Sequence, residues 1–200
     1  VRRLRTFQVD QPGQLRSSAD QALLDLASND TLGLLGHPDL NAAAQTAIAR
    51  GGVGSGASRL ISGSRPEHAE LEQGLAQWLG RSRVLLFPSG FQANIAALQL
   101  LADRHTLVLA DRRIHHSLLV GVRACGAKLE RFAHNDLEDL ERRLHKCKGS
   151  RCVVLSESLF SMEGSSPDVG ALAALCQRHG APLLLDEAHA LGVLGPGGRG

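Results

Sequence analysis

From about residue 83 onward, short apolar runs alternate with longer amphipathic runs, and this alternation constrains the fold of the chain more than any other feature. The apolar runs are bounded by polar or turn-forming residues, as buried strands are. Apolar residues recur at helical spacing between the runs. An alternation of this kind indicates an α/β fold, in which helices flank a mostly parallel sheet. The predicted strands lie at 83–87, 106–111, 128–132, 151–156 and 182–186, and the predicted helices at 91–102, 117–125, 136–145 and 168–179.

The chain before this alternation is organised differently. Residues 1–50 form an N-terminal lead-in segment, polar at first and then helical from about Pro38 to Arg50. The stretch 51–64 holds five Gly and four Ser, so it is either a linker or a close-packed loop that shapes a site. A further helix is predicted up to Leu79, with Ser64 and Glu67 as a possible capping box. We therefore divide the chain into 1–50 and a larger domain, of which 51–200 is the first part.

Composition excludes several classes of function. Hydrophobic residues make up 43% and charged residues 21% of the 200 residues, which is typical of a globular protein rather than a disordered one. Aromatic residues are only 3% and the net charge is +2, so nucleic acid is not expected as a partner. We expect a small-molecule ligand instead.

The sequence offers no sign of a membrane or of an oxidising compartment. No apolar run approaches the length of a membrane span, and Val1 to Arg5 lack the apolar core of a signal peptide. The four cysteines stand singly and show no spacing typical of zinc knuckles or disulfide frameworks. We therefore expect a cytoplasmic protein with reduced thiols.

Two motifs match known signatures by spelling only. Asp186-Glu-Ala-His189 is the box of a helicase family, but no phosphate loop with Gly-Lys-Ser/Thr precedes it. Gly195-Pro-Gly-Gly-Arg-Gly200 spells a dinucleotide fingerprint without the helix that such a fingerprint opens. Neither motif predicts nucleotide binding here.

Polar groups follow four of the predicted strands at their carboxyl ends, where open α/β sheets bind their ligands. Ser89-Gly90-Phe91 opens a helix whose free N–H groups could bind an anion. His115 and His116, then Ser161, then Asp186 follow later strands. A zinc site of His115, His116 and His189 is a weaker alternative, because adjacent histidines point in different directions.

The same residues resemble, in order and spacing, the α-oxoamine synthases from about residue 23 to the last residue. The resemblance implies the aspartate aminotransferase fold (fold type I) of pyridoxal 5'-phosphate (PLP) enzymes, and a homodimer with its site at the subunit interface. The motifs that carry it are Ser28-Asn-Asp-Thr-Leu-Gly-Leu34, Gly54-Ser-Gly-Ala-Ser-Arg59 with Gly63 and His68, Ser89-Gly90-Phe91, Asp111 with His115, Phe160-Ser-Met-Glu-Gly164 and Asp186-Glu-Ala-His189.

The resemblance also implies roles for individual residues. Asp186 would pair with the pyridine nitrogen of PLP, and His115 would stack on the ring and orient the substrate carboxylate. His189 and Ser161 would bond the phenolic oxygen of the ring. Backbone N–H groups of Gly90 and Phe91 would bind the phosphate. On the substrate side the resemblance implies Asn29 and Arg3, with Arg5 nearly as good a match as Arg3.

Within the family, Ser28-Asn29-Asp30 and Asp186-Glu-Ala-His189 favour the biotin-biosynthesis branch, which condenses L-alanine with a pimeloyl thioester of coenzyme A or acyl carrier protein. The alternatives are the glycine-using branches, 2-amino-3-ketobutyrate ligase and 5-aminolevulinate synthase. Thr31 stands where the family usually has Tyr, which leaves the acyl-chain preference open.

The Schiff-base lysine of the family would follow the Asp-x-x-His strand, yet no lysine occurs after Lys148. Without that amine the chemistry of the family cannot start. Either the 200 residues stop inside the large domain of a longer enzyme, or the protein is a non-catalytic partner subunit of the same fold. We expect the first.

Overall fold

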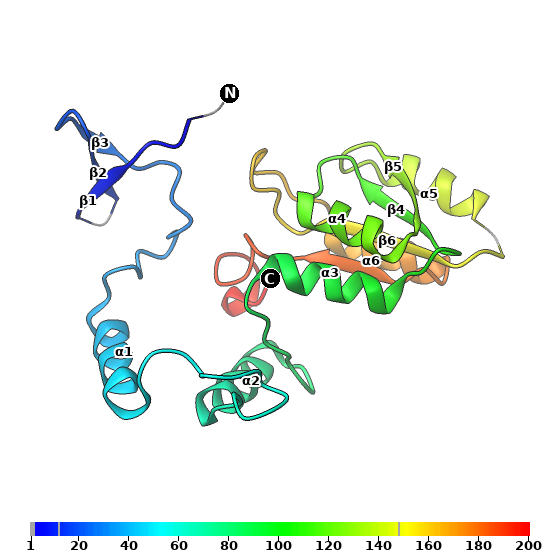
Figure 1. Cartoon of the computed structure of the whole chain (residues 1–200). Coiled ribbons are helices and arrows are strands. Elements are labelled where there is room, and N and C mark those ends of the chain that lie inside the picture. The colour runs from blue at the N-terminus through cyan, green and yellow to red at the C-terminus, as the bar shows by residue number, and fades with distance from the viewer. Residues whose placement is uncertain (1–2, 12, 148) are drawn as a thin grey trace. The chain divides into compact units, whose positions relative to one another are not determined.

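The computed structural model describes residues 3–11, 13–147 and 149–200 (Figure 1). Lys148, the last lysine of the chain, lies outside the described residues. The chain divides into two compact units, residues 1–67 and 68–200. We describe each unit by itself.

The first unit holds a small antiparallel sheet and one helix. Strands β1 (Phe7–Gln11), β2 (Gln14–Ser17) and β3 (Ala22–Leu24) pair in sequence order. Helix α1 (Pro38–Gly51) confirms the helix expected from Pro38, with Pro38 in its first turn and His37 as its N-cap. These three strands were not predicted, although Phe7 and Val9 alternate with polar residues in β1, because the strands are only three to five residues long and hold no fully buried side chain among the described residues.

The glycine-rich stretch after α1 contains a close-packed turn. The N–H groups of Ile61 and Gly63 both donate to the carbonyl of Ser58, at 3.0 and 2.9 Å. A side chain at position 63 could not be accommodated, because its Cβ would lie 1.8 Å from the carbonyl oxygen of Ala57. This part of the stretch is therefore a close-packed loop and not a flexible linker.

The second unit is a three-layer α/β/α domain. Its sheet is parallel throughout, in the order β5-β4-β6-β7. The elements are α2 (Pro66–Leu79, which begins just before the unit boundary), α3 (Gly90–Leu101), β4 (Leu107–Asp111), α4 (His116–Cys125), β5 (Lys128–Phe132), α5 (Leu137–Lys146), β6 (Cys152–Glu157), α6 (Val169–Arg178), β7 (Leu183–Asp186) and a 3₁₀ turn (Pro196–Gly198).

Each face of this sheet carries its own apolar core. On one face α3 and α4 pack against β4 and β6 through residues such as Leu98, Leu118 and Val108. On the other face α5 and α6 pack against the same strands through Leu140, Leu172 and others, and Figure 1 shows the strands between the two helix layers. The central strands β4 and β6 are apolar on both faces, which explains why they are mostly apolar runs in the sequence, whereas the edge strand β5 holds Lys128, Glu130 and Arg131.

One predicted strand is wrong. The run 83–87 joins no sheet in the part of the chain that the structure describes. The backbone N–H of Leu86 donates instead to Oε1 of Glu72 on α2, at 3.0 Å. An apolar run favours extended backbone, but a strand also needs a neighbour that completes its hydrogen-bond ladder.

The other predicted elements of this unit are confirmed to within two residues at each end. No helix in the described ranges combines the length and the apolar character that crossing a membrane requires.

Candidate active site

A cavity of about 330 Å³ opens at the carboxyl end of the parallel sheet. It lies where β6 and β7 end and where α3 and α4 begin. Its lining residues are Gly90, Phe91, Ala93, Asn94, His115, Ser117, Glu157, Leu185, Asp186, Glu187, Ala188 and His189. Five of the site residues predicted from the sequence are therefore brought together here: Gly90, Phe91, His115, Asp186 and His189.

Asp186 presents a carboxylate that neutral donors hold in place. Its Oδ2 accepts from the side-chain amide of Asn94 at 2.8 Å, and its Oδ1 accepts from the backbone N–H of Ala188 at 3.0 Å. The Asn94 amide also bonds Oγ of Ser117, at 2.9 Å. Because these partners carry no charge, they orient the carboxylate without neutralising it, and it can pair with a cationic group of a ligand.

His115 is placed by its role as the N-cap of α4. Its Nδ1 accepts from the backbone N–H of Ser117 at 3.3 Å and lies 2.7 Å from the Ser117 hydroxyl. A neutral imidazole that accepts through Nδ1 carries its proton on Nε2. His116 is the first residue of α4 and does not line the cavity, so the adjacent histidines have different surroundings.

Glu157, the last residue of β6, is a buried acid in the same cavity that the sequence analysis missed. Its Oε1 accepts from the backbone N–H of His115 at 2.5 Å. Burial raises the pKa of Glu157 to about 7, and the nearby charges of Asp186 and Asp111 add to the rise. Glu157 thus couples the end of β6 to the turn that carries His115.

The first turn of α3 forms the opposite wall. Ser89 caps this helix and accepts from the N–H of Gln92 at 3.3 Å. The N–H groups at the start of a helix have no intrahelical partner and lie at the positive end of the helix dipole. Gly90 and Phe91 are therefore placed to bind an anionic group such as a phosphate.

A buried carboxylate supports the turn between β4 and α4. Asp111 is fully buried and accepts from the backbone N–H groups of Arg113 and Asn135, both at 2.8 Å, and from Nδ1 of His134 at 2.9 Å. His134 Nε2 in turn lies 2.8 Å from Oγ of Ser165. This chain joins the ends of β4 and β5 to the loop after β6, so Asp111 acts on His115 through the backbone.

The remaining predicted residues are not in this group. Ser161 lies exposed in the turn that follows β6 and is not among the lining residues. Arg3 and Asn29 belong to the first unit, where both are exposed. The substrate-side assignment of Arg3 and Asn29, and the cofactor contact of Ser161, stay predictions.

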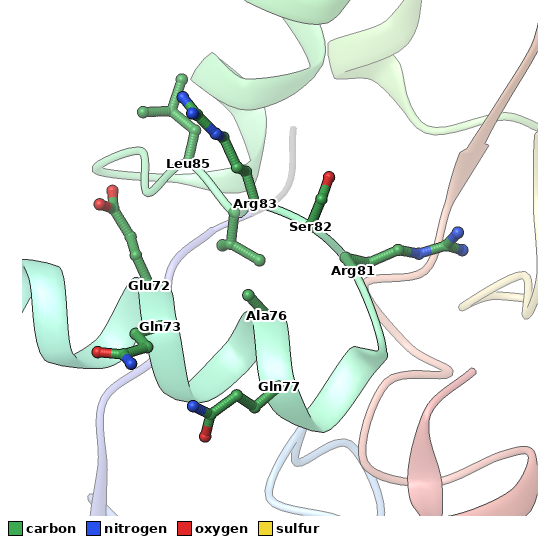
Figure 2. A pocket seen from close by; sticks show the side chains of 9 residues that line it. Glu72, Gln73, Ala76, Gln77, Arg81, Ser82, Arg83 and Leu85 are labelled. Carbon is green, nitrogen blue, oxygen red and sulfur yellow. The ribbon is translucent and has the colours of Figure 1, made fainter.

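A larger cavity, of about 680 Å³, lies between α2 and the segment that follows it. Figure 2 shows the side chains of Glu72 and Gln73 on the helix, and those of Arg83 and Leu85 on the segment that follows it. The acid here already accepts the N–H of Leu86, and no imidazole lines the cavity. We therefore place the chemistry in the smaller cavity, where carboxylates, an imidazole and a helix N-terminus converge.

Comparison with known proteins places the chain among PLP enzymes. The family described as aminotransferase class I and II matches residues 21–199. The chain is 49% identical over 178 residues to 8-amino-7-oxononanoate synthase of Chromohalobacter salexigens, which covers 88% of this chain and 46% of that protein. It is 45% identical over 180 residues to the same enzyme of Anaeromyxobacter sp., covering 90% and 45%. The chain thus spans about half the length of the curated relatives it matches.

Solved structures agree with this result. A serine palmitoyltransferase of S. paucimobilis with bound PLP superposes with a TM-score of 0.91 and 32% identity, over 96% of this chain and 48% of that one. The 8-amino-7-oxononanoate synthase of Francisella tularensis superposes with a TM-score of 0.73 and 31% identity, over 86% and 47%. The expected fold is confirmed: it is the fold type I of PLP-dependent transferases.

Proposed function

The chain belongs to the aminotransferase class I and II family, and from this premise we propose that the complete protein is a PLP-dependent 8-amino-7-oxononanoate synthase. Such an enzyme condenses L-alanine with a pimeloyl thioester and releases carbon dioxide and the thiol, as a step of biotin biosynthesis. The curated relatives that carry this name at 45–49% identity support the proposal. It concerns the complete protein, because the chain spans about half of those relatives.

One observation of the site carries the proposal: Asp186 and the first turn of α3 line the same cavity. PLP is a flat pyridine ring that has a basic ring nitrogen and carries a phosphate on a separate side arm. A carboxylate held by neutral donors suits the nitrogen, and the N–H groups of Gly90 and Phe91 suit the phosphate. The donor set therefore fits the cofactor of this family.

When bound, PLP supplies an electron sink for a carbanion at the amino-acid α-carbon. Asp186 holds a proton at the pyridine nitrogen, which keeps the ring cationic. His115, whose position is set by Ser117 and Glu157, would lie against the ring and orient the substrate carboxylate. His189 donates to the phenolic oxygen. We count Asp186, His115 and His189 as the catalytic residues of this chain.

The proposal extends to groups beyond the cavity. Ser161 is assigned to the cofactor, and Asn29 and Arg3 to the substrate, in a homodimer whose site lies at the subunit interface. Lys128 and Lys146 do not line the cavity, and Lys148 lies outside the described residues. Because the chain spans about half the length of its curated relatives, we propose that the Schiff-base amine belongs to the part of the protein that this span does not cover.

Glycine-using chemistry is the second candidate. The likeness to serine palmitoyltransferase, whose structure superposes with a higher TM-score than that of the Francisella synthase, shows that enzymes of this fold differ in their amino-acid substrate, and it does not favour glycine in particular. The two candidates share the cofactor site and differ in the substrates.

The proposal is tested by replacing Asp186 in the full-length protein. Asp186→Asn should leave PLP bound but lower turnover of L-alanine with pimeloyl thioester by about 100-fold or more, because a neutral amide cannot hold the pyridinium proton. Asp168→Asn is the matched control: it makes the same chemical change at the N-cap of α6, where Asn caps as well as Asp. Wild-type turnover in the Asp186 variant would overturn the assignment. A wild-type protein that binds PLP but forms no product would favour the partner-subunit alternative.

A further inference from the structure

Two histidines and a glutamate meet on the helix layer formed by α5 and α6, and none of them lines the cavity described above. Glu141 and His145 lie one turn apart on α5, and His179 is the C-cap of α6. We propose that these three side chains bind a divalent transition-metal ion of the zinc type, which clips the C-terminal ends of the two helices together.

The geometry comes close to that of a three-ligand site. The ligand atoms of the three residues all lie within 4.8 Å of one another. Nε2 of His179 is 3.8 Å from Oε1 of Glu141, and the two imidazole rings stand edge to face with centroids 4.8 Å apart. Zinc bonds imidazole and carboxylate at about 2.0–2.2 Å, which puts ligand atoms around one ion about 3–4 Å apart. Small side-chain rotations close the difference.

The chemistry of the donors selects the ion. Two imidazoles and one carboxylate suit zinc, cobalt, nickel or copper, whereas calcium and magnesium prefer oxygen ligands alone. Three protein ligands leave a further position for water. The proposed occupant is therefore a divalent transition-metal ion, and not magnesium or calcium.

Backbone structure supports the ligand positions. The side chain of His179 is only 13% exposed, and its backbone N–H bonds the carbonyls of Leu175 and Cys176 at 3.3 and 3.2 Å. His145 lies in the last turn of α5. The negative ends of two helix dipoles thus face the site, and both favour a cation.

One group competes with the ion. The guanidinium of Arg178 lies 3.3 Å from Oε1 of Glu141. Its side chain is 61% exposed, and an exposed ion pair of this kind is weak, so the arginine can turn into solvent when the ion binds.

Titration of the full-length, PLP-loaded protein with Co²⁺ tests the proposal, because cobalt in a three-ligand site gives visible absorption that reports its coordination. We expect one equivalent to bind with that signal and Zn²⁺ to displace it. His145→Gln and His179→Gln should each weaken binding by at least about 100-fold, since even partners outside the coordination sphere are worth 10–100-fold. His105→Gln, an exposed histidine after α3, is the matched control and should change nothing.

A second readout keeps the test decisive if a variant folds poorly. Zn²⁺ should raise the melting temperature of the wild-type protein and of the His105 variant. It should not raise the melting temperature of the double variant His145→Gln/His179→Gln. Stoichiometric Co²⁺ binding that persists in the double variant would overturn the proposal, as would absence of binding to the wild type at millimolar Co²⁺. PLP content is measured in each variant, so loss of the cofactor site is distinguished from loss of the metal site.

Discussion

Asp186 and Glu157 line the same cavity but have different surroundings. Asp186 is bonded by two neutral donors and lies at the end of β7, so its charge stays available to a ligand. Glu157 is buried at the end of β6 with a single backbone donor, and burial raises its pKa to about 7. An acid whose pKa is raised by burial is common in active sites. Asp186 is therefore suited to pair with a cationic group of a ligand, and Glu157 is suited to fix the backbone of His115.

The adjacent histidines provide a direct test of register. His115→Asn keeps a side-chain acceptor for the cap of α4 but removes the ring, so it should change the absorption of bound PLP and raise the Kd for L-alanine about 10-fold, equivalent to about 1.4 kcal/mol. His116→Asn should leave both within about twofold, because His116 does not line the cavity. Spectral titration of the two full-length variants checks this. The reverse outcome would show that the turn before α4 is misassigned.

Glu157 predicts a pH dependence of stability. Its folded pKa of about 7 lies above its ordinary value of 4.5, so between these values the folded state holds a proton that the unfolded state has lost. Stability should therefore fall as pH rises from about 4.5 to about 7, by up to about 3 kcal/mol. Glu157→Gln keeps an oxygen for the N–H of His115 and should flatten this slope. Urea unfolding across that pH range measures the slope.

Glu138→Gln, on the exposed surface of α5, is the control for this experiment. It should keep the wild-type slope. An unchanged slope in the Glu157 variant would mean that another group causes the pH dependence.

The site was only partly predictable from residues. Asp186, His115 and the Gly90 turn could be found because each lies at the end of a predicted strand or within four residues after it, and because each belongs to a motif of the resemblance. Glu157 directly follows the predicted strand 151–156, but it belongs to none of the motifs that carry the resemblance, so it was not assigned to the site. Asn94 is internal to α3, and only the packing of α3 brings its amide to Asp186.

At the scale of elements, the site depends on how closely α3 approaches α4. Gly121 lies on α4 at their contact, where an added Cβ would lie 2.7 Å from Cδ1 of Leu98 and 3.3 Å from the carbonyl oxygen of Asn94. Asn94 on α3 and Ser117 on α4 bond across the same contact at 2.9 Å. A wider separation of the helices would therefore move the amide that orients Asp186.

Gly121→Ala should destabilise the protein by about 1–3 kcal/mol, because the methyl group overpacks the contact. It should also lower turnover, since Asn94 shifts with α3. Gly74→Ala is the matched control: Gly74 lies within α2, and an added Cβ meets no atom within 4 Å. That variant should gain about 0.5–1 kcal/mol from helix propensity. Thermal unfolding and turnover of both variants check the pair, and equal effects would show that the contact is not tight.

Element boundaries in the second unit were predictable for a physical reason. Strands buried on both faces are uniform apolar runs, and Asp136 and Asp168 mark helix starts by accepting the N–H groups of Asp139 and Ala171. The run 83–87 has the same composition, yet whether it pairs depends on a neighbour that the run itself does not encode. The local sequence pattern predicts an extended backbone, but whether that backbone pairs with a neighbouring strand depends on the tertiary fold.

At the scale of the whole molecule, the branch assignment rests on residues from both units. Ser28 and Asp30 build a turn in the first unit: Ser28 Oγ accepts the N–H of Asp30 at 3.0 Å, and Asp30 accepts those of Leu34 and Leu35 at 2.7 and 3.1 Å. The turn presents Asn29, the residue predicted to contact substrate. Glu187 and Ala188 line the cavity of the second unit. Within the motif of the branch, Ser28 and Asp30 thus stabilise the turn, and Asn29 is left for the predicted substrate contact.

The last prediction concerns substrate choice by the complete enzyme. Alanine and glycine differ by one methyl group, and a pocket gains only about 1–3 kcal/mol from that difference, or roughly 10–200-fold in kcat/KM. We expect alanine to be preferred within that range, and pimeloyl to be preferred over acetyl thioester. Thr31, where the family usually has Tyr, should loosen the acyl side and leave the amino-acid side unchanged. The test compares kcat/KM for alanine or glycine with pimeloyl or acetyl thioester, in the wild type and in Thr31→Tyr. It separates the effect on the acyl group from the effect on the amino acid. A preference for glycine with acetyl would move the protein to the ligase branch, and would leave the proposed roles of Asp186 and His115 unchanged, because both roles are proposed for the cofactor that the branches share.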